Sequence, residues 1–228
     1  WIRPEQTEEA RRAGYTVVDA TSVLGTHLAE TVRRYAHEVF TRQDARKVLD
    51  RIAEDNPRVV EDLVPKLVPL ALVQRVFQNL LRERVSIRDA LSILEALGEA
   101  AAMTKNPVLL TEYVRQAVRR LVVKPYLNAA GELPAYFMDP ALERTVENSV
   151  EHGEFASHLN LSPQGIRDLL DRVQKVVGKP ESPVVAVVSS GARCFLRQLV
   201  EPTVGNLYFL SHNEIPAGVK VISLGVIA

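Results

Sequence analysis

A run of apolar residues between Leu63 and Leu97 constrains the fold more than any other part of the chain. Apolar side chains recur there at three- and four-residue spacing, in two series separated by a short polar break. The two series are Leu72, Val73, Val76, Phe77, Leu80 and Leu81, then Ile87, Ala90, Leu91, Leu94 and Leu97. This period predicts two consecutive helices joined by a very short turn, with Ser86 as the N-cap of the second. The rest of the chain must cover their apolar faces.

The sequence before this pair predicts mostly helices. We expect them over residues 1–13, 21–39, 42–54 and 59–63, with a short β-prone run over 15–18. The helix over 21–39 carries an apolar series, and the helix over 42–54 turns Ala45, Val48, Leu49 and Ile52 inward. Pro65 and Pro69 interrupt the approach to the central pair.

The sequence after the pair predicts a mixture of helices and strands. Asn106 and Pro107 start a helix whose basic side chains Arg115, Arg119, Arg120 and Lys124 form a solvated face. The β-like runs over 121–127 and 133–138 predict a β-hairpin, followed by a helix from 139. A helix from 163, a strand over 184–188, a helix over 191–200 and strands over 207–210 and 219–227 then predict a small α/β unit. The expected fold class is therefore α+β with several subdomains.

Composition and motifs give little support to catalysis. The chain has 28 basic and 28 acidic side chains, so no net field draws it to nucleic acid or to anionic lipid. Its single cysteine and five scattered histidines form no metal-binding pattern, and no apolar run is long enough to span a membrane. We therefore expect a protein that is not an enzyme, with no cofactor and no metal.

Two local features have the residue types of chemical sites. Ser189 to Gly191, between a strand and a helix, is placed to hold an anion, but a capped strand-to-helix turn explains it more simply. Cys194 on that helix is interpreted as a small core residue. A winged-helix nucleic-acid-binding module over 85–138 is a further alternative, although the zero net charge disfavours it.

A surface that binds protein is the remaining possibility. Phe40 ends one predicted helix, and two prolines interrupt the apolar stretch from Val59 to Val73. A groove lined by such side chains suits an amphipathic partner helix. From periodicity alone, the same side chains are better explained as local core.

Several motifs along the chain resemble the cytoplasmic domain of the export-gate family, the large membrane proteins at the base of flagellar and virulence type III secretion machines. The resemblance is closer to the flagellar branch and covers nearly the whole chain. The matching segments are 14–19, 26–28, 42–43, 73–97, 110–116, 211–216 and 223–225.

The resemblance implies a docking platform on the cytoplasmic side of a bacterial inner membrane. Such a domain forms a nonameric ring, binds export chaperones with their filament-type substrates, and contacts other components of the export apparatus, with no role for nucleic acid. The chain would then be an N-terminally truncated part of the family's protein. Four subdomains are implied, over 1–15 with 65–84, 16–64, 85–161 and 162–228. The equivalent domain of a virulence injectisome is the alternative within the family, and the Asn213–Pro216 ending disfavours it.

The resemblance also implies a chaperone groove between the first two subdomains. Its residues here are Phe40, His37, Val64, Leu67, Val68 and Ala71. Two of them depart from the family's pattern. His37 stands where the family has an acidic residue, and Ala71 stands where it has a small polar one. The apolar character that a partner helix needs survives both changes.

Overall fold

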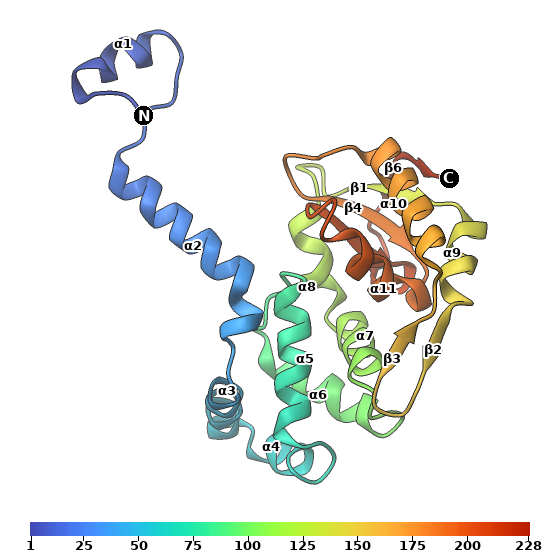
Figure 1. The fold of residues 1–228 in the computed structure, drawn as a ribbon. Coiled ribbons are helices and arrows are strands. Elements are labelled where there is room, and N and C mark those ends of the chain that lie inside the picture. The colour runs from blue at the N-terminus through green and yellow to red at the C-terminus, as the bar shows by residue number, and fades with distance from the viewer.

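The computed structural model describes residues 1–228, and Figure 1 shows an α+β fold. The α-helices are α1 (Thr7–Arg12), α2 (Ala20–Val39), α3 (Arg42–Asp55), α4 (Pro57–Leu63), α5 (Leu70–Arg82), α6 (Ala90–Ala101), α7 (Pro107–Ala117), α8 (Arg119–Val123), α9 (Pro140–Glu147), α10 (Pro163–Val177) and α11 (Ser190–Val200). Short 3-10 helices are η1 (Pro4–Gln6), η2 (Lys124–Tyr126) and η3 (His212–Glu214). The strands are β1 (Leu133–Met138), β2 (Val150–His152), β3 (Ser157–Leu159), β4 (Val184–Val188), β5 (Leu207–Ser211) and β6 (Val221–Ile227). The predicted fold class is confirmed.

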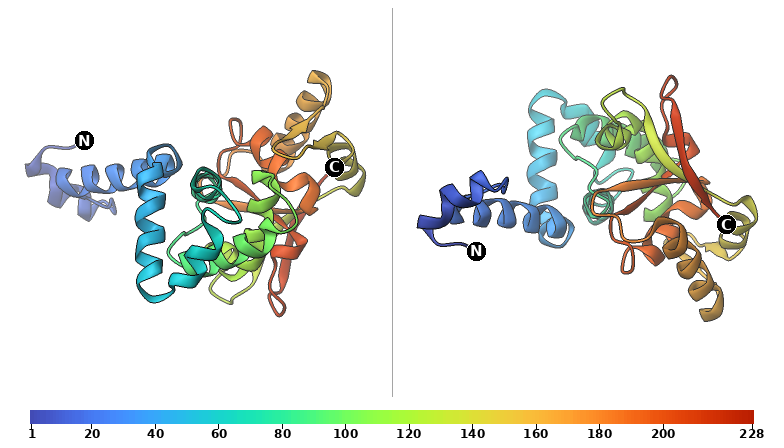
Figure 2. Two further views of the ribbon diagram at one scale, coloured as in Figure 1. Left: turned by 90° about the horizontal axis from the view of Figure 1, so that it is seen from below. Right: turned by 90° about the horizontal axis from the view of Figure 1, so that it is seen from above.

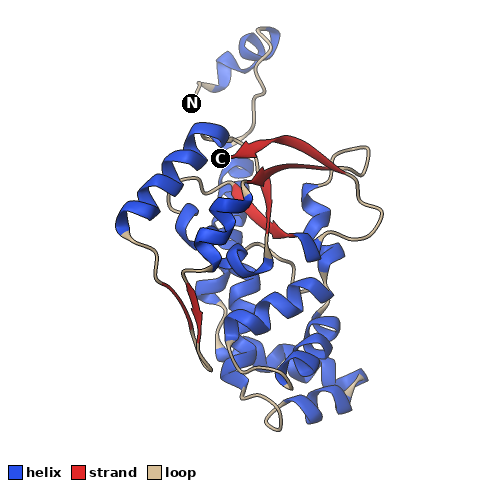
Figure 3. Ribbon diagram, turned by 90° about the vertical axis from the view of Figure 1, so that its right-hand side faces the viewer, coloured by secondary structure: helices blue, strands red, loops and turns tan.

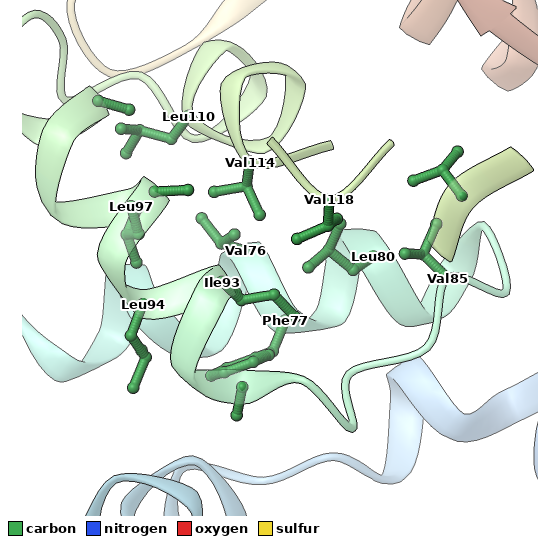
Figure 4. Packing of buried hydrophobic residues seen from close by; sticks show 14 of the residues in the cluster. Val76, Phe77, Leu80, Val85, Ile93, Leu94, Leu97, Leu110, Val114 and Val118 are labelled. Atoms are coloured by element: carbon green, nitrogen blue, oxygen red, sulfur yellow. The ribbon is translucent and has the colours of Figure 1, made fainter. Parts of the chain in front are cut away.

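The central helix pair, α5 and α6, forms the middle of the larger of two cores. Phe77, Leu80, Ile93, Leu94 and Leu97 have no exposed surface and meet side chains of α7 between the helices (Figure 4). The three- and four-residue spacing places these side chains on facing stripes. The turn between the two helices is longer than predicted, because Asp89 rather than Ser86 accepts the capping hydrogen bond, from the backbone N–H of Ser92.

A parallel four-stranded sheet separates this helical core from a second one. Its order is β5-β4-β1-β6, and β2 and β3 form a separate antiparallel pair (Figure 3). Along β4, Val185 and Val187 face the helical core, while Ala186 and Val188 face a smaller core formed with α10 and α11. The alternation follows from the period of two in a strand. The prediction that both faces of this strand are covered is therefore confirmed.

The predicted β-hairpin over 121–138 is wrong. Residues 119–126 form α8 and η2, and only β1 is a strand. β1 pairs in parallel with β4 and β6, so its partners lie far along the chain. The winged-helix alternative needed that hairpin as its wing, and the structure removes this basis for it.

The helix α2 extends away from the rest of the molecule, with α1 at its far end (Figures 1 and 2). Asp19, rather than Thr21 or Ser22, is the N-cap and accepts from the backbone N–H of Ser22. The β-prone run over 15–18 forms no strand. The apolar series of α2 stays largely exposed: Val23, Leu24, Leu28, Val32, Tyr35 and Val39.

A network of buried charges joins α5, α7, α11 and η3. The guanidinium of Arg193 donates to both carboxylate oxygens of Glu83, with Nη2 2.9 Å from Oε1, and to both carboxylate oxygens of Glu112. Arg115 donates to Glu83 over 3.2 Å and to Glu214. Only 2 % of Arg115 is exposed. The prediction that Arg115 belongs to a solvated face is therefore wrong. The network links the helical core to the sheet unit.

Acid is expected to weaken this network through Glu83. Burial alone would raise the pKa of Glu83, but Arg115 and Arg193 outweigh it and lower the pKa from 4.5 to about 2. Between these values the unfolded chain binds more protons than the folded one, so stability falls as the pH falls. The contribution of Glu83, about 3 kcal/mol at ~1.36 kcal/mol per pKa unit, should be complete above pH 4.5 and lost near pH 2.

Urea unfolding of the wild type and of Glu83→Gln, measured at several pH values, tests this expectation. The glutamine variant cannot titrate at this position, so its deficit in unfolding free energy should shrink as the pH falls from about 4.5 to 2. A deficit that stays constant over that range would contradict the assignment.

The sheet also bears on the predicted subdomains. Its strand β1 lies within 85–161, whereas β4, β5 and β6 lie within 162–228. The last two predicted subdomains therefore share one sheet, and the four boundaries themselves remain a prediction. No helix of the chain is both long enough and apolar enough to cross a membrane.

Candidate protein-binding groove

Phe40 lies at the junction of α2 and α3. It is the C-cap of α2, with an extended backbone (φ −72°, ψ 103°) that turns the chain toward α3. Its half-buried ring packs on the helical core, and its centroid lies 5.7 Å from that of Phe77 at an interplanar angle of 54°. Such a tilted pair adds about 0.5–1.5 kcal/mol beyond the buried area. Phe40 is thus held by α5 without being fully covered.

Two glutamines of α5 hold the backbone of Phe40. The side-chain amides of Gln74 and Gln78 donate to its carbonyl oxygen over 3.2 and 3.0 Å. Ala71 precedes Gln74 by three residues and therefore lies on the same face of α5, one turn nearer its start. Ala71 is exposed, so the first turn of α5 on this face is open to solvent. Sequence reasoning missed both glutamines, because only their contact with Phe40 distinguishes them from ordinary solvated side chains.

The connection between α4 and α5 supplies the other predicted groove residues. Val64 is partly buried against the same core as Phe40, and the side chain of Leu67 is 41 % exposed. Lys105 fixes this connection by donating to the carbonyl oxygen of Leu67 over 2.8 Å. Val68 is completely buried and does not line a groove in this conformation; it supports the connection from the core side.

His37 stands one turn before Phe40 on α2. Its Nε2 lies 3.7 Å from a carboxylate oxygen of Glu38, and its Nδ1 is buried without a hydrogen-bond partner. The acidic residue that the resemblance implies at this position is therefore replaced by an imidazole with an acid beside it. The side chain is partly buried, so its ring adds to the surface around Phe40.

The arrangement is suited to binding a protein helix by its apolar face. Phe40, Val64 and Leu67 offer apolar surface that is neither fully buried nor fully free. His37 is the only titratable side chain among the six predicted residues. Affinity at such a surface comes from a few anchoring side chains and the water they displace rather than from charge.

The turn at Ser189 forms the predicted helix cap, and Cys194 is partly buried on α11. The hydroxyl of Ser189 accepts from the backbone N–H of Ala192, and the backbone N–H of Ser189 donates to the carboxylate of Glu143 over 3.2 Å. The start of α11 is thus capped and already faces a carboxylate of the chain itself. Burial raises the pKa of the Cys194 thiol to about 12, which keeps it protonated at neutral pH.

Comparison with known proteins places the chain in a family. The FHIPEP family matches residues 1–220. The flagellar biosynthesis protein FlhA of Escherichia coli is 36 % identical over 219 residues, covering 94 % of this chain and 31 % of that protein. The FlhA of Bacillus subtilis is 31 % identical over 234 residues, covering all of this chain and 34 % of that protein. The chain therefore spans about a third of the length of these relatives.

Solved structures show the same fold. The CdsV protein of Chlamydia pneumoniae superposes with a TM-score of 0.92 at 24 % identity, over 100 % of this chain and 66 % of that one. The nonameric SctV-C of EPEC gives a TM-score of 0.85 at 24 % identity, over 98 % of this chain and 68 % of that one. The C-terminal domain of InvA gives 0.79 at 26 % identity, over 99 % and 69 %. On the agreement of its sequence and its fold, this chain belongs to the FHIPEP family.

Proposed function

We propose that this chain is a docking part of a bacterial flagellar type III export gate, on the cytoplasmic side of the inner membrane. The groove beside Phe40 receives an amphipathic helix of an export chaperone that carries a filament-type substrate. The single observation that carries the docking role is the half-buried ring of Phe40, which packs on Phe77 while Gln74 and Gln78 hold its backbone carbonyl. An aromatic side chain fixed in this way is the usual anchor of a protein interface.

The flagellar assignment is supported by the comparison of identities. The flagellar relatives are 31 and 36 % identical to the chain, whereas the CdsV, SctV-C and InvA structures are 24 to 26 % identical. The equivalent role in an injectisome is the second candidate, favoured by the close match of its fold to CdsV.

Ring assembly is part of the same proposal. The solved SctV-C and EscV cytosolic domains are described as nonameric, and CdsV has been solved in complex with CdsO. By analogy, copies of the full-length protein that contains this chain assemble into a nine-membered ring, which presents its grooves to chaperone complexes and contacts other export components.

Phe40→Ala should weaken binding of a flagellin–chaperone complex by roughly tenfold or more, because an anchoring aromatic contributes about 2 kcal/mol to an interface. Isothermal titration calorimetry of that complex into the chain provides the measurement, and a second titration into the complete cytoplasmic domain shows whether the rest of that domain contributes to the site. Urea unfolding of the same variant separates binding from stability.

Phe155→Ala is the matched control. Phe155 lies between β2 and β3, outside the groove, and is 68 % exposed. Its loss should leave binding within twofold of the wild type. Equal losses of affinity in the two variants, or a loss in Phe40→Ala that merely follows its loss of stability, would show that Phe40 is core and not an anchor. If neither the wild-type chain nor the complete cytoplasmic domain binds the flagellar complex, but an injectisome chaperone complex does bind, the second candidate replaces the first.

A further inference from the structure

A cavity lined by none of the six predicted groove residues lies where α2, the end of α5, the α10–β4 connection and the α11–β5 connection meet. Its volume is about 390 Å³, within the ~300–1,000 Å³ typical of ligand sites. The charged side chains that line it are Arg34, Arg82, Arg84, Lys179, Arg197 and Glu201. We call it the basic cavity.

The basic cavity concentrates positive charge, although the chain as a whole has a formal net charge of zero. Five cationic side chains and one carboxylate line it, whereas the whole chain has equal numbers of basic and acidic side chains. Glu201 already accepts from Arg82 over 3.1 Å and from Arg197 over 3.2 Å. One carboxylate is thus shared between two guanidiniums, and the field in the cavity remains positive.

Two of the five cations pair with no carboxylate of the chain. Arg84 bonds Glu30 over 2.7 Å, but neither Arg34 nor Lys179 forms an ion pair. The position of Lys179 is explained by the helix dipole, because a cation is stabilised near the C-terminal end of α10. Arg34 lies well inside α2 and has no such partner. The cavity therefore offers two cations that pair with no carboxylate, Arg34 from α2 and Lys179 from the α10–β4 connection; the guanidinium carbon of Arg34 lies 5.8 Å from the centroid of the Tyr35 ring.

The floor of the cavity is preorganised. Arg197 is 4 % exposed; its guanidinium stacks on the ring of Tyr208 at 4.4 Å and donates to the carbonyl oxygens of Gly205 and Leu207. These contacts hold a buried positive charge in one orientation, so no rotamer freedom is lost when an anion arrives. A buried cation attracts an anion more strongly than a solvated one does, because less water screens it.

A smaller apolar cavity adjoins the basic one. Its volume is about 150 Å³, and it shares Arg84 and Tyr208 with the basic cavity. Apolar side chains dominate the rest of its lining, among them Val122, Pro125 and Pro183. A free inorganic anion would gain no contact from an apolar cavity beside its binding site. A peptide with an apolar side chain next to its carboxylates fits both cavities.

We propose that the basic cavity binds an acidic segment of a partner protein, which carries at least two carboxylates beside one apolar side chain. Arg34 and Lys179 receive the carboxylates, Arg197 supplies the fixed charge below them, and the apolar side chain enters the adjoining cavity. This surface is additional to the chaperone groove and does not depend on it.

The probe is a fluorescein-labelled peptide with two glutamates on each side of a leucine, titrated with the 228-residue chain and followed by fluorescence anisotropy. Arg34→Gln/Lys179→Gln removes the two cations that pair with no carboxylate, so it breaks no ion pair of the fold. We expect its affinity for the peptide to fall at least tenfold. Peptides with glutamine for glutamate, or with glycine for leucine, should also bind at least tenfold more weakly.

Arg119→Gln/Arg120→Gln is the matched control, because it removes the same charge from an exposed surface outside the cavity. It should change the affinity less than twofold. Equal losses in the two double variants would show nonspecific charge attraction and overturn the proposal. No binding of the peptide, or full displacement of it by millimolar inorganic phosphate with no effect of the leucine, would overturn it as well. Retained binding of the flagellin–chaperone complex by Arg34→Gln/Lys179→Gln keeps this result separate from the groove.

Discussion

Arg193→Met is expected to lower the free energy of unfolding by about 3–5 kcal/mol, which is the usual effect of breaking a buried ion pair by removing one partner. Arg193 has no exposed surface and donates to Glu83 and Glu112, which are themselves nearly buried. Methionine fills a similar volume but donates no hydrogen bond. Both carboxylates then lose their main partner in a place where water cannot replace it.

Urea unfolding at neutral pH measures this loss, and Arg120→Met is the control because Arg120 is exposed and outside the network. The control should change stability by less than about 0.5 kcal/mol. The double variant Glu112→Met/Arg193→Met should be more stable than the sum of its single variants predicts, because no carboxylate of Glu112 is left stranded. Additive effects would mean that the two side chains act independently.

Elements held together by local spacing were predictable from the sequence. The helices α3, α5, α6 and α10 follow from apolar residues one turn apart, and the caps Asn106 and Ser162 mark helix starts through hydrogen bonds to the next few residues. The boundaries of these helices moved by only a few residues, except where Asp89 competed with Ser86 for the cap.

Features that depend on distant partners were not predictable. The segment over 121–127 is rich in residues typical of strands, yet Val122 and Val123 are buried as part of a helix that packs against the core. Arg115 looked like a surface cation because Glu214, its partner, lies 99 residues along the chain. In both cases tertiary packing outweighed the local preference.

The candidate groove was likewise only partly predictable from the sequence. Its assignment to Phe40 came from resemblance to a family, and the sequence by itself favoured a core role for that ring. The structure shows intermediate burial, which fits an anchor that is supported from below. Gln74 and Gln78 lie 34 and 38 residues after Phe40 in the sequence, so no local spacing predicts their hydrogen bonds to its carbonyl oxygen.

Phe77→Ala is expected to cost about 3–5 kcal/mol of stability, because the removed ring has no exposed surface and leaves a cavity in the helical core. Its effect should extend to the groove, since the ring of Phe40 rests against it at 5.7 Å. Phe209→Ala is the matched control, because Phe209 is also buried but belongs to the core on the other side of the sheet. Urea unfolding should show losses of similar size in both alanine variants.

Binding then separates the two positions. The milder variants Phe77→Leu and Phe209→Leu keep most of the core volume and should stay folded under the conditions of a titration. If Phe77 positions Phe40, calorimetry with the flagellin–chaperone complex should show several-fold weaker binding to Phe77→Leu and unchanged binding to Phe209→Leu. A shifted Phe40 ring meets the partner less well, whereas a change beyond the sheet leaves that ring in place. Equal affinities for the two leucine variants would mean that Gln74 and Gln78 alone fix Phe40, because their hydrogen bonds to its carbonyl oxygen survive the loss of the Phe77 ring.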